Sequence, residues 1–394
     1  MLLLFSLCRK RKSVQLAIFA VLVYNMGNLP QKSEGKAMDH FAAIRGRLEK
    51  YGIDAMLLTC APNRFYASGF ASSGTDGVAF VTQEQTYYFT DFRYIEAATA
   101  QVKGAEVEMV KSGRGYLTLL NEAIAKHGIK RIGYEDAYMT VAEFNVYREK
   151  LNCELVPAAK LMTELRAIKD AQEIETLIAA QRIAEKALEE ICNEIRVGVT
   201  EKELAARLTY LMLHYGAENM SFDPIVVSGA NGSMPHGVPT EKPIADGDFV
   251  TMDFGCLYHG YCSDMTRTFA VGHVTEEMDK VYHTVLRAQL AGIERARAGV
   301  SGHEIDAAAR DIIAAAGYGE YFGHSFGHGV GVEIHEAPNA SPNYKEILPA
   351  GAVISAEPGI YLPGKFGVRI EDVIVLRESG CEDITKAPKK LLVL

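Results

Sequence analysis

The stretch VTMDFGCLYHGYCSDMTRTF, residues 250–269, reads as two apolar strands joined by a turn of glycine and tyrosine. Each strand carries one aspartate, Asp253 in the first and Asp264 in the second. Burying an ionised carboxylate is costly unless a nearby partner cancels its charge. We therefore expect a cation, a basic side chain or a proton to lie close to both aspartates in the folded chain.

A second hairpin, AVISAEPGIYLPGKFGVRIEDVIVL at residues 352–376, repeats this chemistry with Glu357 and Glu371. Strand alternation places Arg369 on the same face as Glu371, while Val368 and Ile370 point the other way. Each hairpin follows a pair of predicted helices. We therefore expect a duplicated half-domain, with the four acids gathered about its internal axis.

A glycine-rich segment between the hairpins, FGHSFGHGVGVEIHEAP at residues 322–338, presents His328 between Gly327 and Gly329. Glycine permits close backbone approach or positive φ, so we expect His328 on a tightly folded loop. Four carboxylates and one imidazole carry a net charge near −4, which two divalent cations would neutralise. This oxygen-rich donor set favours Mn²⁺, with Co²⁺, Zn²⁺ or Fe²⁺ as substitutes. The HExxH zinc motif is absent, and the glycines follow no dinucleotide-binding strand, turn and helix.

Length and composition describe an ordinary globular chain. The 394 residues suggest about two domains, and the net charge of −9 argues against a nucleic-acid partner. Seven cysteines are scattered without a CxxC pair, as in a protein that keeps its thiols reduced. Cys256 and Cys262 could ligate a metal or bridge the hairpin, but we expect them to be small buried hydrophobic residues.

The fold class that we predict is α/β (α+β) in two domains. Residues 38–160 alternate short helices and strands, which is typical of layered α/β packing. Residues 161–394 combine a long amphipathic helix at residues 171–195, two helices with capping boxes (Thr200 with Glu203, Ser301 with Glu304), a helix from about residue 276 to Gly299, and the two hairpins.

Residues 1–37 form an N-terminal extension that we expect to lie outside the fold. Its apolar run SVQLAIFAVLVY has about half the residues needed to cross a bilayer, although a signal-peptide core can be this short. We interpret it as a non-native or misassigned extension of a cytoplasmic protein without stable membrane insertion, and a signal peptide is the alternative.

Several blocks together resemble a known family. In order, PHGVPTEKPIADGDFVTMDFG, YCSDMTRTF, GHGVGVEIHEAP, SAEPGIY and GVRIEDVIVL are similar to the blocks of the pita-bread metallopeptidases that act at Xaa-Pro bonds. That family contains the Xaa-Pro aminopeptidases and the Xaa-Pro dipeptidases, or prolidases. NRFYASGFASSGTDG and FTDFRY resemble its creatinase-like N-terminal domain, so the likeness extends from residue 38 to the C-terminus.

The resemblance implies a dinuclear metal centre. Asp253 would chelate one ion, His328 and Glu357 would hold the second, and Asp264 and Glu371 would bridge both. A bridging hydroxide would attack the carbonyl carbon that precedes the proline nitrogen.

The resemblance also implies roles around the metals. Glu357 would shuttle the proton to the departing nitrogen, and His335 and His236 would hydrogen-bond substrate and intermediate. His324 and Arg369 match supporting positions, where Arg369 would orient a neighbouring acid. The expected partners are short proline-containing peptides, and the family implies a homodimer.

Two activities inside the family remain open. Prolidases commonly hold the dipeptide carboxylate with an arginine on the loop after the HE-P turn, whereas this chain has Asn339 and, further on, Lys345. We therefore predict an aminopeptidase that releases the residue before proline, with prolidase as the alternative. Two further alternatives are a metal-free, creatinase-like amidinohydrolase and a non-catalytic binding protein of the same fold.

Overall fold

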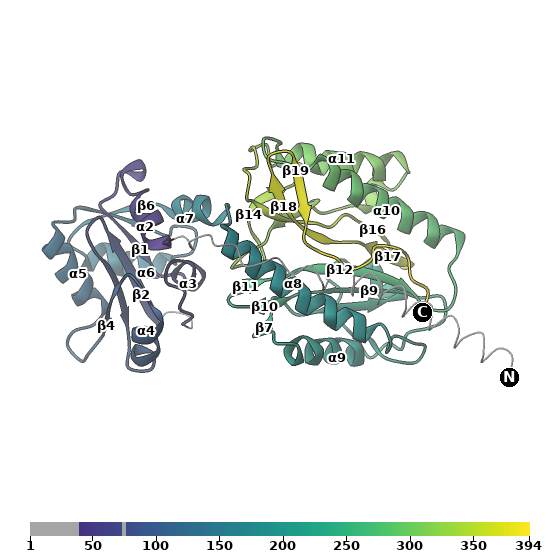
Figure 1. Ribbon diagram of the computed structural model, residues 1–394, viewed down its shortest axis with the longest axis horizontal. Coiled ribbons are helices and arrows are strands. Elements are labelled where there is room, and N and C mark those ends of the chain that lie inside the picture. Colours follow the sequence, from purple (N-terminus) through teal and green to yellow (C-terminus); the bar gives the residue numbers. More distant parts are fainter. Residues whose placement is uncertain (1–38, 73–75) are drawn as a thin grey trace. The chain divides into compact units, whose positions relative to one another are not determined.

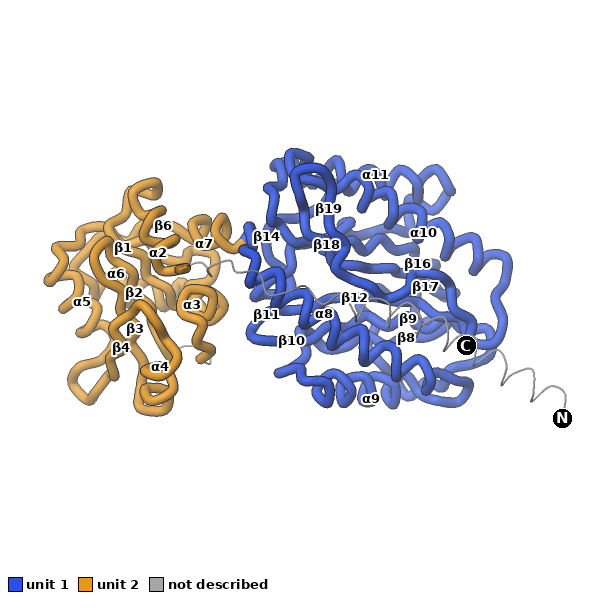
Figure 2. The backbone as a smooth tube through the Cα atoms, viewed as in Figure 1, with its two compact units in different colours: residues 1–35, 167–394 blue, residues 36–166 orange. Residues whose placement is uncertain are grey.

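The computed structural model describes residues 39–72 and 76–394, and the chain divides into two compact units (Figures 1 and 2). The N-terminal unit ends at Arg166 and the C-terminal unit continues from Ala167 to Leu394. The sequence placed this division at residue 160, inside helix α7 (Ala159–Arg166). The whole helix stays with the N-terminal unit, where it packs against α2. The predicted extension at residues 1–37 lies outside the described residues.

The N-terminal unit is built on one six-stranded sheet with the strand order β4-β3-β2-β1-β5-β6. Strands β1, β2 and β3 pair antiparallel, and the remaining pairs are parallel. The strands are β1 (Ala55–Leu58), β2 (Gly77–Thr82), β3 (Thr86–Thr90), β4 (Glu106–Met109), β5 (Arg131–Tyr134) and β6 (Glu154–Pro157).

Helices cover this sheet, and they include elements that the sequence pattern did not reveal. They are α2 (His40–Arg45), α3 (Ala61–Ser68), α4 (Ile95–Gln101), α5 (Tyr116–His127), α6 (Val141–Lys150) and α7, with a short 3₁₀ turn at Glu49–Tyr51. Helix α5 packs its apolar face on β2 and β3. Helix α3 was missed because it buries Asn63 and Arg64, so its inward face carries no apolar period.

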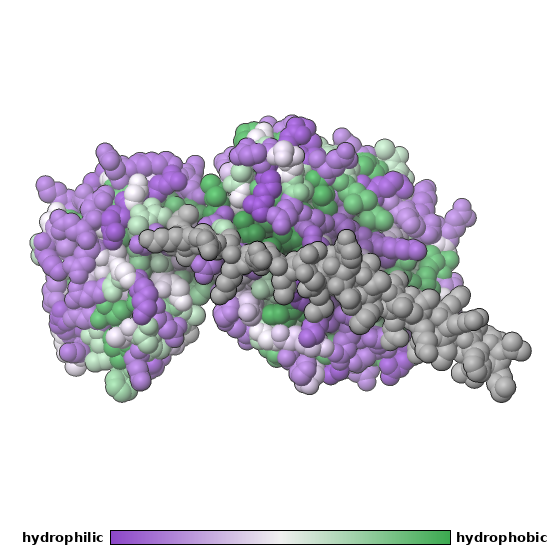
Figure 3. Space-filling view, in the orientation of Figure 1, coloured by the Kyte–Doolittle hydropathy of each residue, from purple (hydrophilic) through white to green (hydrophobic). Residues whose placement is uncertain are grey.

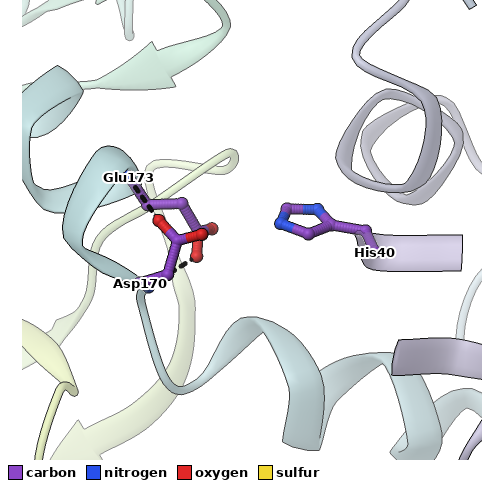
Figure 4. A group of neighbouring side chains, drawn as sticks. All are labelled: His40, Asp170 and Glu173. Atoms are coloured by element: carbon purple, nitrogen blue, oxygen red, sulfur yellow. Dashed lines mark hydrogen bonds between the residues drawn. The ribbon is translucent and has the colours of Figure 1, made fainter. Parts of the chain in front are cut away.

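Four longer helices frame the C-terminal unit: α8 (Ala171–Ile191), α9 (Glu201–His214), α10 (Glu276–Arg295) and α11 (Gly302–Ala315). The predicted capping boxes of α9 and α11 are both formed. Helix α8 begins in the same way, because Asp170 and Glu173 each accept the other's backbone N–H at 2.8 Å (Figure 4). It ends four residues before the predicted Ile195, at Ile191.

The strands of the C-terminal unit form several small sheets, ordered β11-β10-β7, β12-β9-β8, β14-β13-β15-β18-β19 and β16-β17. Their bounds are β7 (Asn219–Met220), β8 (Ile225–Ser228), β9 (Phe249–Phe254), β10 (Cys256–Tyr258), β11 (Tyr261–Cys262), β12 (Met265–Ala270), β13 (Gly327–Gly329), β14 (Glu336–Ala340), β15 (Val353–Ala356), β16 (Gly359–Leu362), β17 (Phe366–Arg369), β18 (Asp372–Arg377) and β19 (Gly380–Asp383). Two 3₁₀ turns lie at Gly229–Ser233 and Gly319–Tyr321.

Among the described residues of this unit, two hydrophobic cores are each made by a helix pair on strands. Helices α8 and α9 pack on β8, β9 and β12, and helices α10 and α11 pack on β15, β17 and β18. This arrangement of a helix pair with a hairpin, occurring twice, is the one expected from the sequence.

The end of the chain is built into the first of these halves. Ala270 on β12 donates its N–H to the carbonyl of Leu392 at 3.0 Å and accepts the N–H of Leu394 at 2.8 Å. The buried Arg267, also on β12, donates to the carbonyl of Ala387 at 2.7 Å and pairs with Asp372 at 2.7 Å. The last residues therefore extend the hydrogen-bonding of β12.

Polar side chains cover much of the visible face of each unit (Figure 3). Within residues 39–72 and 76–394, none of the helices combines the length and apolar character that a membrane crossing requires.

Candidate metal centre

Each half of the C-terminal unit contributes two of the four predicted acids. Asp253 lies within β9, whereas Asp264 lies between β11 and β12, Glu357 between β15 and β16, and Glu371 between β17 and β18. The expectation that each acid sits in a continuous strand is therefore wrong for three of them. At Glu357 the following Pro358 has no N–H to donate to a ladder, so strand pairing stops at the acid.

Three of the predicted ligands have ligand atoms close enough together to bind one metal ion. Asp264, His328 and Glu371 each provide a ligand atom, and these atoms all lie within 4.8 Å of one another. His328 Nε2 is 3.1 Å from Glu357 Oε1 and 3.6 Å from Asp264 Oδ2. Asp253 pairs with Thr266 in the β9–β12 register, and Thr266 donates a hydrogen bond to Glu371 at 2.6 Å.

Crowding of buried charge alters the protonation of these groups. Burial, together with the charges of neighbouring acids, raises the pKa of Asp264 and that of Glu371 well above their ordinary values. Burial also raises the pKa of Glu357, but the hydrogen bond and charge of His328 outweigh it and bring that pKa to about 2. Burial lowers the pKa of His328, while Glu357 and Asp264 raise it to about 9. These shifts reflect the cost of gathering several carboxylates in a buried site.

These residues fit a pair of divalent metal ions. Four carboxylates converge, and the charged side chains seen against them are the Arg369 guanidinium and the His328 imidazole. Asp253 Oδ1 is buried, and no described residue gives it a hydrogen bond. An orphaned buried carboxylate oxygen is costly, and a cation would satisfy it. Oxygen donors with one imidazole suit Mn²⁺ and similar ions.

His328 occupies the centre of β13 rather than the tight loop that we expected. Its flanking glycines have no positive φ. Instead, a Cβ at Gly327 would overlap the Ser355 carbonyl, and one at Gly329 would overlap the backbone of Glu336. Glycine is needed here for close strand packing. His328 Nδ1 faces the Gly329 carbonyl at 3.2 Å, which directs Nε2 toward the acids.

Arg369 and His324 meet at a residue that the sequence reasoning missed, Tyr361. The Arg369 guanidinium donates to Asp253 Oδ2 at 2.5 Å, to the Tyr361 hydroxyl at 2.8 Å and to Thr266 Oγ1 at 3.1 Å. His324 Nε2 lies 2.9 Å from the same hydroxyl. Burial lowers the pKa of His324 and raises that of Tyr361 to about 12. Alternation in the β16–β17 hairpin, which places Tyr361 on the face of Arg369, was the signal that could have identified it.

His335 and His236 are the exposed members of the predicted set. The His335 ring makes an edge contact with the His328 ring, with centroids 4.2 Å apart. Burial and the charge of His328 lower the pKa of His335. His236 follows Pro235, whose carbonyl accepts a hydrogen bond from Arg369 at 3.3 Å. Both imidazoles are therefore available to a ligand beside the acids.

The two hairpin cysteines take no part in this cluster. Cys256 and Cys262 are free and buried. Cys256 Sγ contacts the Ala180 carbonyl at 3.4 Å, and Cys262 Sγ contacts the Val332 carbonyl at 3.8 Å. Burial raises the pKa of both thiols. They pack as small hydrophobic residues, as the sequence indicated.

A hollow of about 460 Å³ in the N-terminal unit is lined by Asp54, Glu84 and His127 among others. Its charges have structural uses. Asp54 accepts the backbone N–H groups of Lys130 and Arg131 at 2.8 Å, and Glu84 contacts His127 at 3.1 Å. The C-terminal unit therefore holds the stronger candidate site.

Comparisons with known proteins identify the family to which the chain belongs. Residues 175–378 match the model of metallopeptidase family M24, and residues 41–168 match the creatinase/prolidase N-terminal domain. The Xaa-Pro dipeptidase of Pyrococcus horikoshii is 39% identical over 349 residues, covering 88% of this chain and 96% of the relative.

Solved structures of Xaa-Pro peptidases are also similar to this chain. An Xaa-Pro dipeptidase from Bacillus anthracis is similar with a TM-score of 0.86 and 42% identity, covering 91% of this chain and all (100%) of that one. An X-Pro aminopeptidase from Thermotoga maritima MSB8 has a TM-score of 0.83 and 37% identity, covering 88% of this chain and 100% of that one. With its creatinase-like N-terminal domain and its pita-bread C-terminal unit, the chain belongs to metallopeptidase family M24.

Proposed function

We propose that this protein is a metal-dependent Xaa-Pro peptidase whose ions are held by Asp253, Asp264, His328, Glu357 and Glu371. The observation that carries the proposal is the gathering of four acids and one imidazole, in which Asp253 Oδ1 has no hydrogen-bond partner among the described residues. When bound, the ions supply Lewis acidity and a water that is acidic enough to act as a nucleophile near neutral pH. Manganese is our first choice because oxygen donors predominate.

The chain's own residues then bind substrate and move the proton. Glu357 is ionised at neutral pH, because its pKa is brought to about 2, and it can accept a proton. Its Oε1 accepts a hydrogen bond from Ser355 at 3.0 Å and faces His328, which leaves its other oxygen to carry the proton toward the departing proline nitrogen. The exposed imidazoles of His335 and His236 would hydrogen-bond the substrate.

Arg369 has a positioning part in this proposal. Its guanidinium spans Asp253, Thr266 and Tyr361, so it fixes the orientation of the Asp253 carboxylate. His324 reaches the same tyrosine hydroxyl and supports this arrangement from the other side.

Within the family we propose dipeptidase activity on Xaa-Pro. The similarity to the dipeptidases of Bacillus anthracis and Pyrococcus horikoshii, at 42% and 39% identity, supports dipeptidase activity over the aminopeptidase activity predicted from the sequence. Aminopeptidase activity on Xaa-Pro-Yaa peptides is the second candidate. It is favoured by Asn339, which stands on the loop where prolidases commonly carry an arginine for the dipeptide carboxylate.

One experiment tests both the metal dependence and the substrate preference. The protein is dialysed against chelator, reconstituted with Mn²⁺, and assayed on Ala-Pro and on Ala-Pro-Ala. Loss of hydrolysis on chelation and its return with Mn²⁺ are expected, with Ala-Pro as the faster substrate. Hydrolysis that survives complete metal removal would refute the metal mechanism, and a strong preference for Ala-Pro-Ala would establish the second candidate.

Metal content separates the remaining alternatives. A metal-free amidinohydrolase or a non-catalytic binding protein has no reason to keep four converging acids without a counter-charge. Elemental analysis that finds no stoichiometric metal after Mn²⁺ reconstitution would favour those alternatives. The homodimer and the cytoplasmic location stay predictions, to be checked by light scattering and by cell fractionation.

A further inference from the structure

A buried ion pair lies outside the proposed ligand set. Lys169 Nζ is 2.7 Å from Glu336 Oε1, and the two side chains are only 1% and 6% exposed. Removing one partner of such a pair leaves an uncompensated charge in the interior, so both side chains are strongly constrained.

Glu336 ties together the segment that carries His335. It directly follows His335, opens β14 and pairs in register with Gly329, which is the neighbour of His328. Its second oxygen accepts the backbone N–H of Glu333 at 3.2 Å. The carboxylate thus holds residues 331–336 folded back on themselves, at the end of the strand that presents His328.

Lys169 is itself fixed to the framework. Its backbone N–H donates to the Gly351 carbonyl at 3.0 Å, and it precedes Asp170, the N-cap of α8. Its ammonium group therefore connects the start of α8 to the start of β14.

His335 needs such an anchor. Apart from the edge contact with His328, the described residues provide no hydrogen bond to its imidazole, which is exposed. Its position is therefore set by the backbone of residues 331–336. Displacing a substrate-binding group by about 1 Å can cost roughly 100-fold in rate.

We propose that Lys169 is a positioning residue, which through its ion pair with Glu336 holds residues 331–336 so that His335 faces the substrate. The part concerning substrate rests on the proposed function; the anchoring of the segment does not.

The test uses the full chain and three variants: Lys169→Met, Glu336→Gln and the double variant. Lys202→Met is the matched control, because Lys202 forms an exposed ion pair with Glu241 at 2.9 Å. Each protein is reconstituted with Mn²⁺ and examined for metal content, thermal unfolding, kcat and KM on Ala-Pro, and backbone hydrogen exchange in the metal-free form.

For Lys169→Met we expect faster exchange in residues 331–336, unchanged exchange in β18 and two bound Mn²⁺. We also expect kcat/KM to fall roughly 10- to 100-fold, mostly through kcat. The double variant should regain thermal stability, since neither charge is left unpaired, yet remain as slow as Lys169→Met. Lys202→Met should match the parent protein.

Exchange in residues 331–336 that stays at the parent level in Lys169→Met would overturn the proposal. So would a double variant that regains activity together with stability, because the pair would then serve stability alone. If the parent protein hydrolyses no Xaa-Pro peptide, the proposed function fails, and the exchange measurements still decide whether Lys169 anchors the segment.

Discussion

Thr266 offers a sensitive test of how the buried acids are held. It is fully buried on β12, donates its hydroxyl proton to Glu371 Oε2 at 2.6 Å and accepts a hydrogen bond from Arg369 Nε at 3.1 Å. Thr266→Val keeps the shape of the side chain and removes both hydrogen bonds. Glu371 loses a neutral donor, and the guanidinium loses the partner on its Nε.

The size of the effect follows from the charge of the acceptor. A hydrogen bond to an ionised group contributes about 1.5–3 kcal/mol, and every ~1.4 kcal/mol is a factor of ten in affinity. If Glu371 binds the metal, Mn²⁺ affinity should therefore fall roughly 10- to 150-fold. The unpaired Nε of Arg369 should separately cost about 1–3 kcal/mol of folding free energy.

The assay is calorimetric titration of the metal-free protein with Mn²⁺, accompanied by kcat/KM on Ala-Pro. Thr251→Val is the control, since Thr251 is buried on β9 and its hydroxyl bonds to Thr268 at 3.0 Å and to the Gly367 carbonyl at 3.5 Å. The control should bind Mn²⁺ as the parent does. Parent-like Mn²⁺ affinity in Thr266→Val, or equal weakening in both variants, would refute the assignment of Glu371 as a ligand oriented by Thr266.

Three further predictions concern other residues of the C-terminal unit. Asp264→Ala should abolish hydrolysis by removing a proposed metal ligand, whereas Cys262→Ala should keep most of it; equal losses in initial-rate assays would contradict these roles. Tyr361→Phe should lower kcat/KM about tenfold, because Arg369 loses one of its anchors, and an unchanged value would remove that residue from the positioning network. Burial and a neighbouring aspartate raise the pKa of Asp383 from 3.8 to about 6. The folded protein therefore binds a proton on the Asp383 carboxylate more tightly than the unfolded chain does. Its free energy of unfolding thus decreases as pH rises from 4 to 6. The free energy of unfolding of Asp383→Asn, measured by denaturant unfolding, should therefore increase relative to that of the parent by at most about 3 kcal/mol between pH 4 and pH 7. An equal difference between variant and parent at both pH values would disprove this.

Features fixed by short-range rules could be predicted from the sequence. The capping boxes at Thr200 and Ser301 depend on residues three apart, and both form. Alternation identified the strands that contain Asp253 and Arg369. It could not show that pairing stops at Asp264, Glu357 and Glu371, because alternation assigns a face and says nothing of where a ladder ends.

Residues that support the site were harder to find because they act across long separations. Thr266 and Glu371 are 105 positions apart, and Lys169 and Glu336 are 167 apart. Such pairs depend on how segments from different parts of the chain pack together, which a single sequence does not show. The charge of four acids and one histidine indicated a metal site from the residues alone, but the separate roles of the five proposed ligands came only from the resemblance to a known family.

The pairing of the last residues with β12 has a practical consequence for anyone who produces this protein. A purification tag fused after Leu394 would start beside Gly272, just beyond the strand whose Arg267 contacts Asp372 and the carbonyl of Glu371. A tag at this end would therefore be attached to a segment that pairs with a sheet adjoining the acids. Preparations made with one should be compared with protein from which it has been cleaved before any metal affinity is interpreted.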